Sequence, residues 1–170
     1  MDAAAEREFR EYVTLRQGAL YRTALLLTGH REDAEDLLQA ALTKLAGRWT
    51  RVYQSGSPDA YVRKILYHQH VSRWRVGRRR SEYAAAEPPN TITADPAGDS
   101  TLRLAVWQAL RQLTARQRAI LVLRYYEDLP EAEVADLLGC TIGTVRSTAH
   151  RSLARLRVLC PELASILETT

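Results

Sequence analysis

The stretch Glu131–Arg157, EAEVADLLGCTIGTVRSTAHRSLARLR, decides the fold of this chain, because its residues form the pattern of two helices joined by a tight turn. Gly139 tolerates the positive φ found just past a helix end, and the Thr141 hydroxyl can cap a second helix. The small Ala135 leaves room for the helices to cross. The predicted buried faces are Val134, Leu137 and Leu138, then Val145, Ala149, Leu153 and Leu156. The stretch therefore predicts a helix-turn-helix.

The second helix of this motif is basic and contains no acid. Its cationic or titratable side chains are Arg146, His150, Arg151, Arg155 and Arg157. An unopposed positive helix attracts a polyphosphate backbone. An ordinary helical hairpin with a solvated basic face is the alternative, but spacing, turn residue and charge asymmetry together favour DNA binding.

Composition and length indicate a helical protein of one ordinary domain or two small ones. The chain has 170 residues, is 46% hydrophobic and carries a net charge of +4 with a pI near 9.3. Ala, Leu and Arg dominate, and β-branched runs are rare, which favours helices over sheet. The N-terminus lacks an apolar signal core, and no apolar run approaches a membrane span. With only Cys140 and Cys160 available, we expect no disulfide framework and a reduced, cytoplasmic protein.

The remaining sequence predicts an all-α fold of two small helical domains. Hydrophobic periodicity predicts helices over 6–28, 30–49 and 60–80, with a loop over 51–58. Acids and prolines then replace the cations, so 81–100 is predicted to be an acidic, Pro-containing linker. We thus expect domains over 1–80 and 101–170, the second containing the helix-turn-helix.

The predicted helix over 60–80 is a second candidate nucleic-acid surface. It contains many Arg and Lys residues and no acid, with Tyr61, Tyr67 and Trp74 interleaved. Cations bind phosphates, and aromatic faces can stack on unpaired bases. The alternative is a solvated basic helix whose aromatics pack in the core, and we expect some of Tyr61, Ile65 and Trp74 to do so.

Patterns typical of enzymes are missing from the sequence. His68 and His70 are two positions apart on a helix and cannot easily share a metal. The cysteines lack the spacing of zinc ligands, and no Gly-rich phosphate loop or nucleophile elbow is present. We therefore expect no catalysis, no cofactor and no metal.

Three stretches, in this order, resemble parts of a bacterial RNA polymerase sigma factor of the extracytoplasmic-function (group IV) type. DAEDLLQ (Asp33–Gln39) is similar to the core-polymerase contact of that family. YVRKILYHQHVSRWR (Tyr61–Arg75) is similar to its −10 promoter helix, and RQLTARQRAILVLRYYEDLPEAEVADLLGCTIGTVRS (Arg111–Ser147) to its −35 domain. The resemblance covers nearly the whole chain, and His70 and Trp74 suggest an actinobacterial subgroup.

The resemblance implies a role for each site. The implied core-polymerase contacts are Asp33, Glu35, Asp36, Leu37 and Gln39; charges alone would also fit acids that only complement the helix dipole. The implied contacts to the −10 DNA are Arg51, Tyr53, Arg63, Lys64, Tyr67, His68, Val71, Arg73, Trp74 and Arg75. The implied contacts to the −35 DNA are Thr141, Ile142, Gly143, Thr144, Arg146, Ser147, His150 and Arg151.

The implied function is promoter-specific transcription initiation. The protein would bind core RNA polymerase, recognise a duplex −35 element and a melted −10 element, and promote DNA melting. Family members are often held by an anti-sigma protein, which is a candidate partner here. The other function considered is a free-standing helix-turn-helix regulator that binds operators as a dimer. Such a regulator needs a self-interface or ligand domain, whereas 1–80 offers a basic nucleic-acid face.

Overall fold

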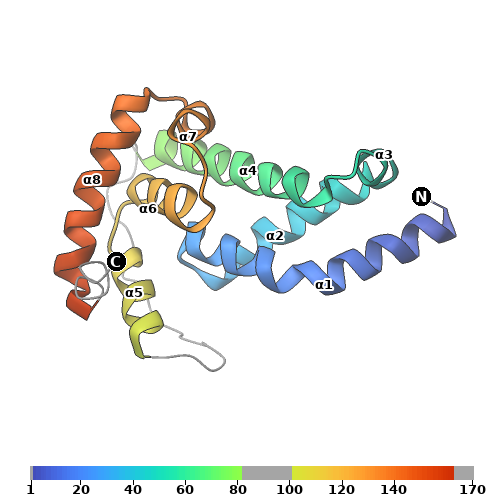
Figure 1. The fold of residues 1–170 in the computed structure, drawn as a ribbon, viewed down its shortest axis with the longest axis horizontal. Coiled ribbons are helices and arrows are strands. Elements are labelled where there is room, and N and C mark those ends of the chain that lie inside the picture. The colour runs from blue at the N-terminus through green and yellow to red at the C-terminus, as the bar shows by residue number, and fades with distance from the viewer. Residues whose placement is uncertain (1, 82–100, 163–170) are drawn as a thin grey trace. The chain divides into compact units, whose positions relative to one another are not determined.

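The computed structural model describes residues 2–81 and 101–162, and all the regular elements of these residues are helices (Figure 1). The predicted all-α fold is confirmed. The chain divides into two compact units, Met1–Arg73 and Trp74–Thr170. The boundary between these units falls ahead of the predicted domain limit at residue 80. The predicted acidic linker over 81–100 lies outside the described residues, apart from Ser81.

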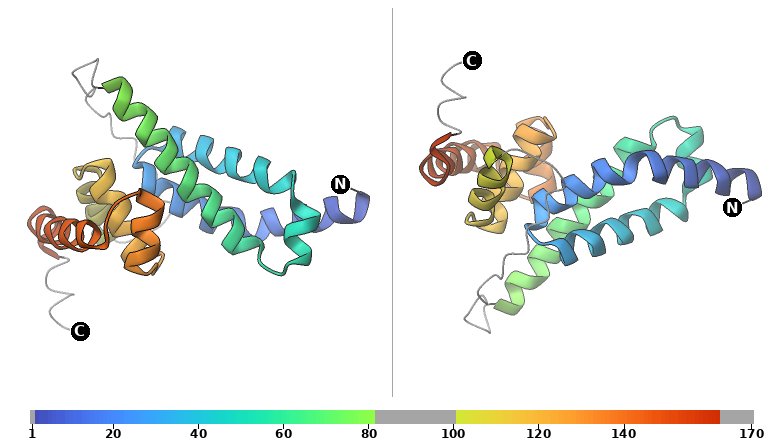
Figure 2. Two further views of the ribbon diagram at one scale, coloured as in Figure 1. Left: turned by 90° about the horizontal axis from the view of Figure 1, so that it is seen from above. Right: turned by 90° about the horizontal axis from the view of Figure 1, so that it is seen from below.

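The helices of the first unit are α1 (Ala3–Thr28), α2 (Arg31–Ala46), α3 (Trp49–Gln54) and α4, which runs from Pro58 to Ser81 and ends beyond the unit. Helix α1 begins three residues earlier than predicted, because the Asp2 carboxylate accepts a hydrogen bond from Ala5 N at 2.8 Å. It ends as predicted at Gly29, whose φ of 75° reverses the chain. Helices α1 and α2 then pack along each other (Figures 1 and 2).

The predicted loop over 51–58 is wrong for its first four residues, which belong to α3, and for Pro58, which begins α4. The indole of Trp49 is 1% exposed, with ring centroids 5.2 Å from Phe9 and 5.3 Å from Tyr12. Val52, one turn later, is also buried. A six-residue helix is marginal alone, so tertiary burial of these two side chains stabilises it. The second helix correspondingly ends at Ala46 rather than near Trp49.

Helix α4 is anchored to α1 at its first turn. Pro58 occupies the first helical position, where a missing N–H costs nothing. The Asp59 Oδ1 atom accepts hydrogen bonds from Tyr12 Oη at 2.8 Å and Arg16 Nε at 2.9 Å, and the second carboxylate oxygen pairs with Arg16 Nη2. Buried side chains of α4 complete the core of this unit: Val62, Leu66, Tyr67, His70 and Val71.

The second unit contains the predicted helix-turn-helix. The helices that lie entirely within this unit are α5 (Thr101–Arg111), α6 (Ala115–Leu121), the π-helical turn η1 (Val122–Tyr126), α7 (Glu131–Leu138) and α8 (Ile142–Leu159). Gly139 has φ 62° and ψ 46°, and Thr141 Oγ1 accepts a hydrogen bond from Thr144 N at 3.1 Å. The predicted apolar faces are buried, except that Leu153 is half-buried. The helix-turn-helix prediction is confirmed.

None of the helices in the described part of the chain combines the length and apolar character required to cross a membrane.

Candidate nucleic-acid and partner interfaces

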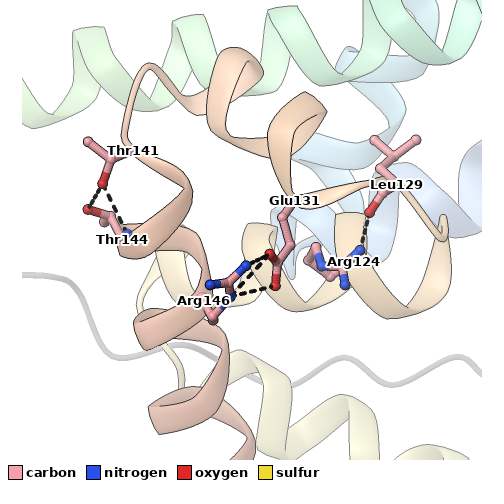
Figure 3. A network of polar contacts seen from close by, with 6 residues as sticks. All are labelled: Arg124, Leu129, Glu131, Thr141, Thr144 and Arg146. Carbon is pink, nitrogen blue, oxygen red and sulfur yellow. Dashed lines mark hydrogen bonds and ion pairs between the residues drawn. The ribbon is translucent and has the colours of Figure 1, made fainter.

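The first turn of α8 is an exposed polar surface organised by its cap. Besides capping the helix, Thr141 Oγ1 lies 2.9 Å from Thr144 Oγ1, so both hydroxyls are fixed at the helix start (Figure 3). Ile142 is 43% exposed. A Cβ at Gly143 would meet only Thr141 Oγ1, at an ordinary 3.8 Å. Packing therefore does not require this glycine, and its small size leaves room for a close partner.

Helix α8 separates its buried residues from its exposed basic ones. The buried residues are Val145, Thr148, Ala149, Ser152 and Leu156, at the spacing of one helix face. Of the predicted −35 contacts, Thr144 is half-buried and seven are exposed: Thr141, Ile142, Gly143, Arg146, Ser147, His150 and Arg151. The structure thus brings all eight to α8 or its cap.

Arg146 forms an ion pair that the sequence analysis missed. Its Nη2 donates to Glu131 Oε2 at 2.7 Å, and its Nε donates to the same oxygen at 3.2 Å (Figure 3). The hydrogen bond from Arg146 lowers the pKa of Glu131, and the charges of Arg146 and Arg124 add to this effect. The hydrogen bond and charge of Glu131 in turn raise the pKa of Arg146. Both groups are therefore ionised near neutral pH.

The predicted −10 contacts on α4 divide into surface and core residues. Lys64, His68 and Arg73 are exposed, and Arg63 and Trp74 are half-buried. Tyr67 and Val71 are each only 4% exposed. Those two side chains pack in the core of the first unit. The side chain of Arg75 lies outside the described residues.

The two predicted contacts ahead of α4 lie on α3 and reach solvent. Arg51 is exposed, and Tyr53 is 48% exposed. The Tyr53 ring centroid lies 5.0 Å from that of Trp49, so the core supports one side of this exposed ring. The turn after α3 places Gly56 at φ 77°, where an added Cβ would meet none of the described atoms within 4 Å.

An acidic surface covers the exposed side of α2. Asp33, Glu35, Asp36 and Gln39 are exposed, whereas Leu37 is fully buried. Leu37 therefore packs the core, and the four polar residues of the predicted polymerase contact are the exposed ones. Arg73 Nη2 of α4 donates to Asp36 O at 3.4 Å, which brings the basic surface of α4 beside this acidic one.

Comparisons with known proteins identify the family. The Sigma-70 region 2 model matches residues 12–80, and the Sigma-70 region 4 model matches residues 103–156. The RNA polymerase sigma-E factor of Streptomyces coelicolor is 39% identical over 150 residues, covering 88% of this chain and 84% of that protein. The ECF RNA polymerase sigma factor SigL of Mycobacterium tuberculosis is 30% identical, covering 85% and 84%.

A solved structure agrees with these relatives. The sigma factor RpoE of Bartonella quintana, crystallised in complex with the anti-sigma factor NepR, matches with a TM-score of 0.68 and 27% identity. The match covers 90% of this chain and 96% of the RpoE chain. The chain therefore belongs to the sigma-70 family of RNA polymerase sigma factors, within its extracytoplasmic-function group.

Proposed function

We propose that this sigma factor divides promoter recognition between two helices, α4 for the −10 element and α8 for the −35 element. One observation carries the assignment: each helix buries an apolar side and exposes basic side chains to solvent. Exposed Arg and Lys side chains bind phosphates and base edges. Catalysis belongs to the polymerase, and this chain contributes binding energy and position alone.

The −35 element is proposed to lie against the first two turns of α8. A helix enters the major groove with its N-terminal residues against base edges. Arg146 is the strongest candidate for a base contact, because a guanidinium can bond two acceptors of a guanine. Residues further along the helix, His150 and Arg151, are placed for the phosphate backbone.

The −10 element is proposed to bind as an opened strand across α3 and α4. Lys64 and Arg73 supply cations beside the exposed His68, while Arg51 and Tyr53 border the turn that would hold a flipped base. Stacking of one base on an aromatic ring contributes about 1–3 kcal/mol. That energy favours the melted strand over the closed duplex.

The acidic surface of α2 is proposed as the contact to core polymerase. Four exposed polar side chains form it: Asp33, Glu35, Asp36 and Gln39. Complementary charge speeds association and selects the partner. An anti-sigma protein is a second proposed partner, supported by the complex of the Bartonella relative. Both encounters would occur in the cytoplasm, where polymerase and chromosome lie.

Transcription by purified core polymerase on a pooled genomic promoter library tests the proposed function. Adding this protein should create discrete new start sites that share spaced −35 and −10 sequences. Absence of new starts, with tight binding to duplex DNA by the protein alone, would instead identify a free-standing regulator. The same library reveals the promoter sequence on which the variant experiments depend.

Arg146→Ala tests the −35 assignment. We expect transcription from an intact −35 promoter to fall by roughly 5- to 150-fold, the range for one bidentate base contact. Transcription from a promoter already disrupted at −35 should change little. Arg155→Ala is the matched control, since Arg155 is exposed further along α8 and donates to Gln112 O at 3.5 Å. An equal fall on both promoters would refute the assignment.

A further inference from the structure

The ion pair between α7 and α8 has a geometry with consequences for DNA recognition. Glu131 is the first residue of α7, and Arg146 lies in the second turn of α8. The carboxylate contacts the guanidinium side-on, through Nε and Nη2 (Figure 3). The Arg146 side chain nevertheless remains 70% exposed, against 28% for Glu131. The pair thus fixes one edge of the arginine and leaves another open to solvent.

The donors of the guanidinium show which edge stays available. Arginine has five N–H donors in a rigid plane. Glu131 occupies the Nε donor and one Nη2 donor, so the remaining donors lie along the edge formed by Nη1 and Nη2. That edge matches two neighbouring acceptors, such as O6 and N7 of a guanine in the major groove. An isolated arginine would lose side-chain entropy to adopt such an orientation, whereas a paired one has already lost it.

The Glu131 carboxylate also disfavours a second binding mode, in which Arg146 contacts the phosphate backbone. A negative charge beside the arginine repels nearby phosphates and lowers the gain from backbone contacts. A base edge carries no net charge and is much less affected. Arg124, whose charge also acts on Glu131, donates to Leu129 O in the segment ahead of α7 (Figure 3).

We propose that Glu131 is a specificity-determining positioning residue, which orients Arg146 toward a base edge and opposes its use as a phosphate contact. This inference rests on the proposed role of α8 in −35 recognition. Its signature is a pair of opposite changes. Loss of the Glu131 charge lowers discrimination between promoter sequences and raises affinity for unrelated duplex DNA. A carboxylate that only joined α7 to α8 would change stability without producing this pair.

The experiment uses holoenzyme reconstituted from core polymerase and the full chain. The variants are Glu131→Gln, Arg146→Ala and their combination, with Glu133→Gln as matched control because Glu133 is an exposed acid on the same helix. Competition binding measures the affinity ratio of the intact −35 promoter to each single-base-pair substitution, and to a duplex without promoter sequence. Thermal unfolding of each free variant monitors the fold.

At one −35 base pair, Arg146→Ala should reduce the ratio by roughly 5- to 150-fold, and Glu131→Gln at the same base pair by about 3- to 10-fold. The double variant should match Arg146→Ala, because Glu131 acts through the arginine. Glu131→Gln should also bind unrelated duplex more tightly, and Glu133→Gln should leave the ratio unchanged.

Three results would overturn an assignment, and they are distinguishable. If Arg146→Ala changes no ratio, the proposed −35 role of Arg146 fails, and the inference fails with it. If Arg146→Ala changes one ratio but Glu131→Gln behaves like Glu133→Gln, only the positioning role of Glu131 is refuted. If Glu131→Gln lowers the unfolding temperature and leaves every ratio intact, its role is structural.

Discussion

Ala135→Leu tests whether the crossing of α7 and α8 requires a small residue. Ala135 is 4% exposed on α7, and its carbonyl accepts a hydrogen bond from Cys140 N at 3.0 Å in the turn that leads to α8. A leucine adds three carbon atoms to this filled space. Overpacking a core position costs about 1–3 kcal/mol of folding free energy. We therefore expect the two helices to separate and the second unit to lose stability.

Thermal unfolding of the full chain measures this loss. In a unit of 60–100 residues each 1 kcal/mol corresponds to about 4–8 °C, so the midpoint of the second unit should fall by at least about 4 °C. Ala132→Leu is the matched control, since Ala132 is exposed on the same helix and receives the same added atoms. Its effect on the unfolding free energy should stay within about 0.5 kcal/mol.

Transcription provides the functional arm of the same test. Ala135→Leu should abolish the advantage of an intact −35 element while core-polymerase binding persists through the first unit. Equal midpoints for Ala135→Leu and Ala132→Leu would refute the argument that this helix crossing excludes a larger side chain.

The other predictions concern separate parts of the chain. Asp36→Arg reverses a charge on the exposed acidic surface and should weaken binding to core polymerase without lowering the unfolding midpoint; unchanged affinity would contradict the proposed contact. Gly139→Ala should destabilise the second unit by about 1–2 kcal/mol, because a Cβ is unfavourable at φ 62°. Gly139→Asn should cost less, because asparagine tolerates this conformation better. Equal unfolding midpoints for the two variants would exclude the positive φ as the cause. Partial burial raises the pKa of Asp59, but hydrogen bonds from Arg16 and Tyr12 and nearby positive charges outweigh it and lower the pKa below 3.8. The stabilisation that ionised Asp59 gives to the folded state is therefore complete at pH values above 3.8, and it is lost as the pH falls through the lowered pKa of Asp59. The side chains of Asp59 and Arg16 are 42% and 40% exposed, so solvent weakens their interaction. Asp59→Asn should therefore lower the unfolding free energy by only about 0.5–1 kcal/mol at pH 7, and by less at pH 2, as measured by urea unfolding. A loss that does not change with pH would contradict this linkage.

Local sequence signals predicted the helix-turn-helix because its decisive residues act on their own neighbourhood. A glycine with positive φ and a threonine that caps the next helix are recognisable without knowledge of the rest of the chain. Gly139 and Thr141 fulfil these roles in the structure. The same reasoning placed the end of α1 at Gly29.

Elements that depend on distant contacts escaped the sequence analysis. Helix α3 has the Ser and Gly of a loop directly after it, and its formation depends on burial of Trp49 against Phe9. The Glu131–Arg146 pair joins residues 15 positions apart, and only the crossing of α7 and α8 brings them together. Helix α8 contains no acid, so its own sequence gives no sign that Glu131 of α7 pairs with Arg146.

Family resemblance alone does not show which side chains of a motif reach solvent. It assigned contact roles to Leu37, Tyr67 and Val71, which the structure places in the core. A motif position specifies where a residue lies along a helix, whereas the helix phase decides which side chains reach solvent. The exposed members of each set remain as predictions for the interfaces.

The aromatic cluster around Trp49 constrains how the proposed −10 contacts on α3 can be engineered in this chain. Tyr53 is exposed, yet its ring lies on Trp49, whose other neighbours, Phe9 and Tyr12, belong to α1. Grafting the segment Trp49–Ser57 from a relative would replace Trp49 and Tyr53 but leave Phe9 and Tyr12 in place, so the new side chains would face residues of α1 that do not match them. A graft that also transfers the facing residues Phe9 and Tyr12 of α1 would preserve the packing around Trp49 and Tyr53. The portable module is therefore discontinuous in sequence.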